Sequence, residues 1–160
     1  MTDLESELSW KQFATDVAAL ASKILVSDFD PQMIVAVARG GWIPTRYLSS
    51  LLNVKEITSI GLRYVDQERR SLENYSFPQP IATGMNILLV EDMLESAKSL
   101  AKAKELFEAK GARVKTAALY FSSHAVIIPD FSLGERKNAI KFPWEVDLSI
   151  VAKDVSTGSN

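Results

Sequence analysis

The chain has 160 residues, of which 47% are hydrophobic and 24% charged, as in a globular domain and unlike disordered or low-complexity chains. It contains no cysteine and one histidine, which excludes disulfides, a cysteine nucleophile, thiolate metal sites and multi-histidine metal sites. The net charge of −2 and the acidic, polar start of the chain predict a cytoplasmic protein that binds neither membranes nor nucleic acid.

The first segment with helical periodicity lies near the start of the chain. Its apolar residues recur every three or four positions, on one face of a helix: Trp10, Phe13, Val17, Leu20 and Ile24. We expect Asp3 or Ser6 to cap this helix and residues 28–31, which include a proline, to end it. A short and partly β-branched apolar run over residues 33–37 then predicts a buried parallel strand.

The next segments alternate a helix, a strand and a long irregular stretch. Pro44 suits the first turn of a helix whose apolar face comprises Tyr47, Leu48, Leu51 and Leu52. Residues 56–64 alternate loosely between apolar and polar, as in a strand. Residues 65–84 break every pattern with charges, two prolines and a glycine. They predict either a flexible lid over a binding site or a solvated hairpin.

The second half of the chain contains the clearest strand–helix–strand unit. We expect a buried strand over residues 86–90, a helix over 96–110 with Gly111 as its C-cap, and an apolar strand over 114–121. A shorter closing section carries Phe131, Ile140, Phe142 and Trp144.

The order of these elements predicts an α/β fold. Repeated strand–helix–strand crossovers give a mostly parallel central sheet flanked by helices. We expect residues 1–150 to form a single domain and residues 151–160 to form a disordered tail. In such sheets ligands bind at the carboxyl ends of the strands, where two sequence features stand out.

The first feature, Arg39-Gly40-Gly41, follows the strand predicted at 33–37. Paired glycines let the backbone turn sharply and bring amide groups close to an anion, and the arginine supplies a positive fork for phosphate oxygens. Taken alone, this tripeptide is equally consistent with a tight strand-to-helix turn that carries a surface arginine and binds no ligand.

The second feature follows the strand predicted at 86–90. Glu91, Asp92 and Glu95 place three carboxylates within five residues, and residues 96–99 (Ser-Ala-Lys-Ser) open the next helix. Hydroxyls and free amides at the positive end of a helix dipole form an anion site, most naturally for a phosphate monoester. Glu91 and Asp92 could accept hydrogen bonds from a sugar diol or hold hydrated Mg²⁺. An acidic helix cap would explain Glu95 and Ser96, but not two further acids at the end of a buried strand.

Residues 87–99 resemble the phosphoribosyl-pyrophosphate (PRPP) signature of the type I phosphoribosyltransferases: four apolar residues, two acids, two apolar residues and a loop of small residues. Residues 39–41 stand where that family keeps its pyrophosphate loop, and residues 65–84 where it keeps its lid. Residues 35–54 (VAVARGGWIPTRYLSSLLNV) and 142–145 (FPWE) are most similar to the short purine members, the xanthine-guanine and hypoxanthine types.

The resemblance implies Mg²⁺-dependent transfer of phosphoribose from PRPP to a nucleobase, a purine, with release of pyrophosphate. Arg39, Gly40 and Gly41 would hold pyrophosphate, and Glu91 and Asp92 the ribose hydroxyls and, through water, Mg²⁺. Glu95 would be the catalytic acid or base. The remaining substrate-binding positions would be Met93, Leu94, Ser96, Ala97, Lys98, Ser99 and Ile140. The family also implies a homodimer or homotetramer.

The chain departs from the family pattern in the phosphate loop and in the base pocket. The family has Asp-Thr-Gly-x-Thr where this chain has residues 95–99 (Glu-Ser-Ala-Lys-Ser), so Glu95 is longer and Ala97 adds a Cβ. Purine members carry a lysine where Ser122 and Ser123 stand, and an aromatic ring near Ala139. An alternative function is therefore a PRPP- or nucleotide-sensing regulatory protein that retains the phosphate site and has weak or no turnover.

Overall fold

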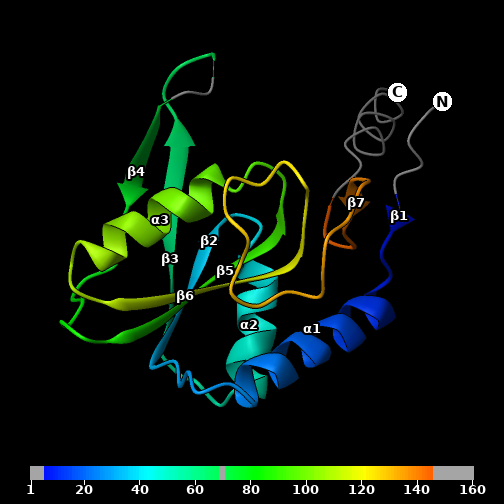
Figure 1. Cartoon of the computed structure of the whole chain (residues 1–160), viewed down its shortest axis with the longest axis horizontal. Coiled ribbons are helices and arrows are strands. Elements are labelled where there is room, and N and C mark those ends of the chain that lie inside the picture. The colour runs from blue at the N-terminus through cyan, green and yellow to red at the C-terminus, as the bar shows by residue number, and fades with distance from the viewer. Residues whose placement is uncertain (1–5, 69–70, 146–160) are drawn as a thin grey trace, which may run out of the picture.

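The computed structural model describes residues 6–68 and 71–145, and its central sheet confirms the predicted α/β architecture (Figure 1). Five strands lie in the order β4-β3-β2-β5-β6. Their bounds are β2 Met33–Ala38, β3 Ile57–Tyr64, β4 Leu72–Ser76, β5 Asn86–Leu94 and β6 Arg113–Phe121. All pair in parallel except β4, which runs antiparallel to β3. The tail predicted at 151–160 lies outside the described residues.

Helices cover both faces of this sheet. α1 (Trp10–Leu25) and α2 (Trp42–Leu51) pack on one face, and α3 (Lys98–Glu108) packs on the other (Figure 1). The strands show why: Ile34 and Leu88 join the core under α1 and α2, whereas Val35 and Leu89 join the core under α3. A continuous apolar run is therefore needed, because both faces are buried. None of the described helices is long and apolar enough to cross a lipid bilayer.

The start of α1 differs from the prediction. Ser9 is the N-cap, and its hydroxyl accepts a hydrogen bond from the Gln12 amide at 3.1 Å. The predicted cap Ser6 instead lies in β1 (Ser6–Glu7), which pairs in parallel with β7 (Ile140–Lys141) as a separate two-stranded sheet. Asp3, the other predicted cap, lies outside the described residues. Tertiary pairing with the closing section places Ser6 in a strand, and the local cap is Ser9, three residues further along the chain.

The boundaries of β5 and α3 also differ from the prediction. β5 continues beyond Val90 to Leu94, because its parallel ladder with β6 continues to the pair Leu94 and Phe121. α3 begins at Lys98 rather than at residue 96, because Ala97 at its N-cap has a left-handed φ of 56°. The helix ends at Glu108 with Ala109 as its C-cap, so Gly111 is not the C-cap.

Residues 65–84 contain the strand β4, whose antiparallel pairing with β3 confirms the hairpin interpretation. The pairing begins at Tyr64 and Leu72, and four of the five β4 residues are exposed. The edge strand therefore presents a solvated face, as an antiparallel edge can. Closure of this segment over a ligand remains a prediction.

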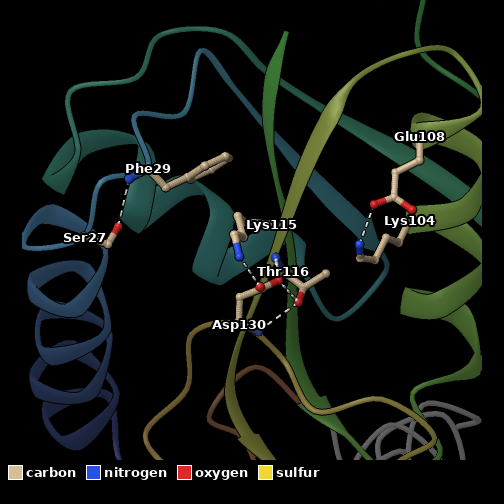
Figure 2. Close-up of polar contacts among 7 residues, drawn as sticks. All are labelled: Ser27, Phe29, Lys104, Glu108, Lys115, Thr116 and Asp130. Atoms are coloured by element: carbon tan, nitrogen blue, oxygen red, sulfur yellow. Dashed lines mark hydrogen bonds and ion pairs between the residues drawn. The ribbon is translucent and has the colours of Figure 1, made fainter. Parts of the chain in front are cut away.

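The segment after β6 is fastened to that strand by Asp130 (Figure 2). Its carboxylate accepts hydrogen bonds from the Thr116 amide and hydroxyl, both at 2.8 Å, and from Lys115 Nζ at 2.7 Å. Partial burial would raise the pKa of Asp130, but these hydrogen bonds and the charge of Lys115 outweigh it and lower the pKa below its ordinary value. This contact directs the chain toward the closing section.

Candidate functional site

A cavity of about 260 Å³ opens at the carboxyl ends of the central strands. Its lining includes the unbroken run of residues 91–99, from the end of β5 through the first turn of α3. Ile140 of β7 also lines it. Ten of the thirteen predicted site residues therefore meet at one cavity: Glu91, Asp92, Met93, Leu94, Glu95, Ser96, Ala97, Lys98, Ser99 and Ile140.

The remaining three predicted residues, Arg39, Gly40 and Gly41, are not part of this lining. They follow β2, and the Ala38–Arg39 peptide bond is cis. Gly40 lies against the Asp92 side chain, since a Cβ built on it would fall 2.5 Å from Asp92 Oδ1. The glycine turn and the acidic pair are thus in contact, which brings the two strand-end features together.

Glu91 and Asp92 are two neighbouring carboxyl groups at this cavity, without a basic side chain to pair with them in the described part of the chain. Burial, together with the smaller effects of the nearby charges of Asp92 and Glu95, raises the pKa of Glu91 to about 8. Burial also raises the pKa of Asp92, although hydrogen bonds from the Met93 amide and from the Trp144 side chain act in the opposite direction. Within residues 6–68 and 71–145, no ion pair involves either carboxylate.

The pKa of Glu91 predicts a pH-dependent stability for the protein free of ligands and divalent cations. Between about pH 4.5 and 8 the unfolded state loses a proton that the folded state keeps, so the free energy of unfolding falls as pH rises through this window. Glu91→Gln removes the effect. At pH 8 the variant should be more stable than the wild type by a few kcal/mol, at about 1.4 kcal/mol per pKa unit.

Urea denaturation in EDTA at pH 5 and at pH 8 measures this difference. The exposed control Glu56→Gln should keep the wild-type pH dependence. An equal pH slope for Glu91→Gln and the wild type would show that Glu91 ionises normally in the folded protein.

The turn into α3 forms an anion site. Ala97 occupies the N-cap and has no side chain that could accept from the first turn, so the helix start is capped only by a long hydrogen bond of 3.5 Å from the Lys98 amide to the Ser96 hydroxyl. Ser96 and Ser99 add hydroxyls to the cavity lining, and Lys98 adds a positive charge. Free amides at the positive end of a helix dipole favour a bound phosphate.

The backbone of Ala97 is strained in this turn, because its φ of 56° lies in the left-handed region. A left-handed conformation costs a residue with a Cβ about 1 kcal/mol, whereas glycine adopts it without strain. Ala97→Gly should therefore raise the free energy of unfolding by roughly 0.5–1 kcal/mol, as measured by urea denaturation. The matched control is Asn53→Gly, since Asn53 has a φ of 55° and asparagine tolerates this region. If Asn53→Gly raised the free energy of unfolding as much as Ala97→Gly, the gain at Ala97 would not reflect the strain of an alanine in this conformation.

The closing section reaches the acidic pair through Trp144. This indole hydrogen-bonds to Asp92 and stacks on Phe142 at a ring separation of 4.7 Å, and Phe142 itself lines the cavity. Trp144 also packs edge-on against Phe13 of α1 at 4.9 Å. An aromatic cluster therefore connects the first helix and the closing section to the carboxylate at the end of β5.

Three residues of the cavity lining were missed by the sequence analysis: Tyr64, Phe142 and Glu145. Tyr64 ends β3, which is parallel to β2, so its position at a strand end was an available signal. Phe142 and Glu145 belong to the FPWE segment, whose side chains reach the cavity through the tertiary packing of Trp144. His124 lines a neighbouring cavity together with Glu95 and Ser96.

The sequence matches the phosphoribosyl transferase domain family over residues 5–150. A xanthine-guanine phosphoribosyltransferase of Cereibacter sphaeroides is 27% identical over 90% of this chain and 89% of its own length. Among solved structures, a purine phosphoribosyltransferase from Pyrococcus horikoshii has a TM-score of 0.81 at 26% identity, covering 89% of this chain and 95% of that one. The xanthine-guanine-hypoxanthine phosphoribosyltransferase of Helicobacter pylori also has a TM-score of 0.81, at 25% identity, covering 93% and 99%.

Proposed function

Because the chain belongs to the phosphoribosyl transferase domain family, we propose that it transfers phosphoribose from PRPP to a purine base. The observation that carries this proposal is the single cavity lined by residues 91–99, where carboxylates and a helix N-terminus meet. The base nitrogen forms a bond to C1 of the ribose with inversion. The bond from C1 to the pyrophosphate oxygen breaks, pyrophosphate leaves, and the base loses a proton.

The proposal assigns the polar groups of the cavity to successive parts of PRPP. Ser96, Lys98 and Ser99 bind the 5′-phosphate together with the free amides of α3. Glu91 and Asp92 accept hydrogen bonds from the ribose hydroxyls, and their charge stabilises a cationic ribose in the transition state. Arg39 and the Gly40 amide bind the departing pyrophosphate, whereas the Gly41 amide donates to the Val37 carbonyl at 3.0 Å and holds the turn.

The other lining residues serve the acceptor base. Glu95 is exposed at the cavity and takes the proton that the base loses. Met93 and Leu94 flank the ribose and the base, and Ile140 packs on the base from the opposite element, β7. Each role follows from the chemistry of the side chain and from its place in the lining.

The acidic pair also fits a magnesium ion. Besides burial, the charge of Asp92 raises the pKa of Glu91 and the charge of Glu145 raises the pKa of Asp92, and a cation relieves this repulsion. The described residues contain no cluster of three or more metal-ligating side chains, so waters and substrate phosphates would have to complete the coordination of Mg²⁺. Glu91 and Asp92 would hold it, and the ion would neutralise charge on the pyrophosphate.

The test is pyrophosphate release from PRPP in the presence of Mg²⁺ and each of hypoxanthine, guanine, xanthine and adenine. Release that depends on a base supports the proposal. Binding of PRPP in calorimetry without release for any of these bases would contradict it.

That second result is what a PRPP-sensing regulatory protein would give. Ala97 favours this alternative, because its buried Cβ stands in the turn that binds the phosphate and restricts the approach of the anion. Ala97→Gly separates the two functions. Restored base-dependent release in this variant would identify a phosphate site whose turnover is limited by Ala97.

We further propose that the protein forms a homodimer or homotetramer. α2 exposes Trp42, Tyr47 and Leu51, which a second copy could cover. Light scattering after size-exclusion chromatography gives the mass in solution, and a monomeric mass at micromolar concentration would contradict the proposal.

A further inference from the structure

A second cavity, of about 340 Å³, adjoins the first and shares Met93, Glu95 and Ser96 with it. Its other walls come from the segment that follows β6 and from the segment that precedes β7. Ser122 and His124 follow β6, and residues 136–139 precede β7. A ligand that contacts Glu95 in the first cavity therefore lies next to this space.

Arg136 is held at this cavity by contacts on two sides. Its backbone amide donates to the Phe121 carbonyl at 2.8 Å, and its guanidinium carbon lies 4.4 Å from the centre of the Tyr120 ring. Arg136 also hydrogen-bonds to the Tyr120 side chain, and because its exposed guanidinium carries five N–H donors, the others stay available to a ligand.

The ring beneath Arg136 is itself fixed by a buried carboxylate. Tyr120 is 4% exposed, and its hydroxyl donates to Asp16 Oδ2 at 2.6 Å. The other oxygen of Asp16 accepts from Gln12 Nε2 at 2.8 Å. α1 thus supports the end of β6, and the end of β6 supports Arg136.

The chemistry of the second cavity selects among purines. Arg136 and Lys137 bring positively charged donors to it, and Ser122 brings a hydroxyl. On one edge a 6-oxopurine presents two acceptors, N7 and O6, to which arginine donates, whereas adenine presents the donor N6–H₂ there. If adenine occupied this space, its N6–H₂ group would face the N–H donors of the protein. Donors that the bound base shields from water without pairing them weaken binding.

We propose that Arg136 determines acceptor specificity by donating hydrogen bonds to the 6-oxo group of the purine. The inference rests on the proposed function for the assignment of this space to the base. The site then prefers 6-oxopurines over 6-aminopurines, and the discriminating group comes from the segment before β7.

The test compares the binding of inosine 5′-monophosphate and adenosine 5′-monophosphate to the full chain by calorimetry, in the presence of Mg²⁺. The wild type should bind the inosine nucleotide at least tenfold more tightly. Arg136→Met should reduce this ratio by about ten- to a hundredfold, as expected for a hydrogen bond from a charged donor. Arg136→Lys should retain part of the preference.

Two further variants separate a specific contact from a general effect of charge. Lys137→Met removes the neighbouring cation and should change the ratio less than Arg136→Met. Lys110→Met, beyond the end of α3, should leave both affinities at wild-type values. Thermal unfolding of each variant checks that the fold is retained.

Three results would overturn the proposal: a wild type that does not distinguish the two nucleotides, equal weakening of both by Arg136→Met, or an equal effect of Lys137→Met. These outcomes are independent of turnover. A wild type that prefers the inosine nucleotide but releases no pyrophosphate with any base would contradict the proposed function and leave the role of Arg136 supported.

Discussion

Asp92→Asn is expected to lower kcat/KM for PRPP by about 10²–10³-fold, the scale on which loss of one electrostatic contact acts in an enzyme site. The substitution keeps the size of the side chain and one acceptor oxygen, so it removes chiefly the negative charge. That charge is what a hydrated Mg²⁺ and a cationic ribose require. Base-dependent pyrophosphate release, measured over a range of PRPP and Mg²⁺ concentrations, gives the value.

Stability provides the second measurement for this variant. Burial raises the pKa of Asp92, which means that the folded protein disfavours its charged form. Asp92→Asn should therefore unfold at a urea concentration equal to or higher than the wild type at pH 8. A control, Asp30→Asn, changes an exposed residue outside the cavity and should leave kcat/KM unchanged. Full activity of Asp92→Asn would remove Asp92 from the proposed chemistry.

The central sheet was predictable from the sequence because its strands are buried on both faces. Residues 33–37 and 86–90 are apolar at every position, save Asn86, and a short run of this kind between turn residues indicates a parallel strand. The carboxyl ends of neighbouring parallel strands meet at one edge of the sheet. The meeting of Gly40 with Asp92 follows from that geometry.

The extent of β5, the β1–β7 pairing and the side-chain contacts around the site could not be predicted, because they depend on pairing between distant segments. The composition of residues 91–94 does not show that β5 continues through the acidic pair, since its continuation is imposed by β6. Pairing of β1 with β7 joins residues more than 130 positions apart, and no local pattern specifies it. For the same reason the hydrogen bond of Trp144 to Asp92 and the stack of Arg136 on Tyr120 appear only in the folded chain.

The adjacent glycines of the β2 turn should give opposite results when each is changed to alanine. Gly41 is enclosed by backbone, since a Cβ on it would lie 2.1 Å from the Val90 carbonyl oxygen and 2.8 Å from the Val37 amide nitrogen. Neither strand can move without breaking the sheet. Gly41→Ala should therefore reduce the free energy of unfolding by about 3 kcal/mol or more, measured by urea denaturation.

Gly40→Ala meets a side chain rather than backbone. Its Cβ would fall 2.5 Å from Asp92 Oδ1, and the carboxylate can rotate away. The fold should survive with a loss below about 1.5 kcal/mol, whereas kcat/KM for PRPP should fall about a hundredfold, as displacement of a reacting group by one ångström typically causes. Wild-type stability of Gly41→Ala, or wild-type activity of Gly40→Ala, would contradict this division. The expected division follows from the neighbours: Gly41 holds two strands together, and Gly40 leaves room for the carboxylate on which the proposed chemistry depends.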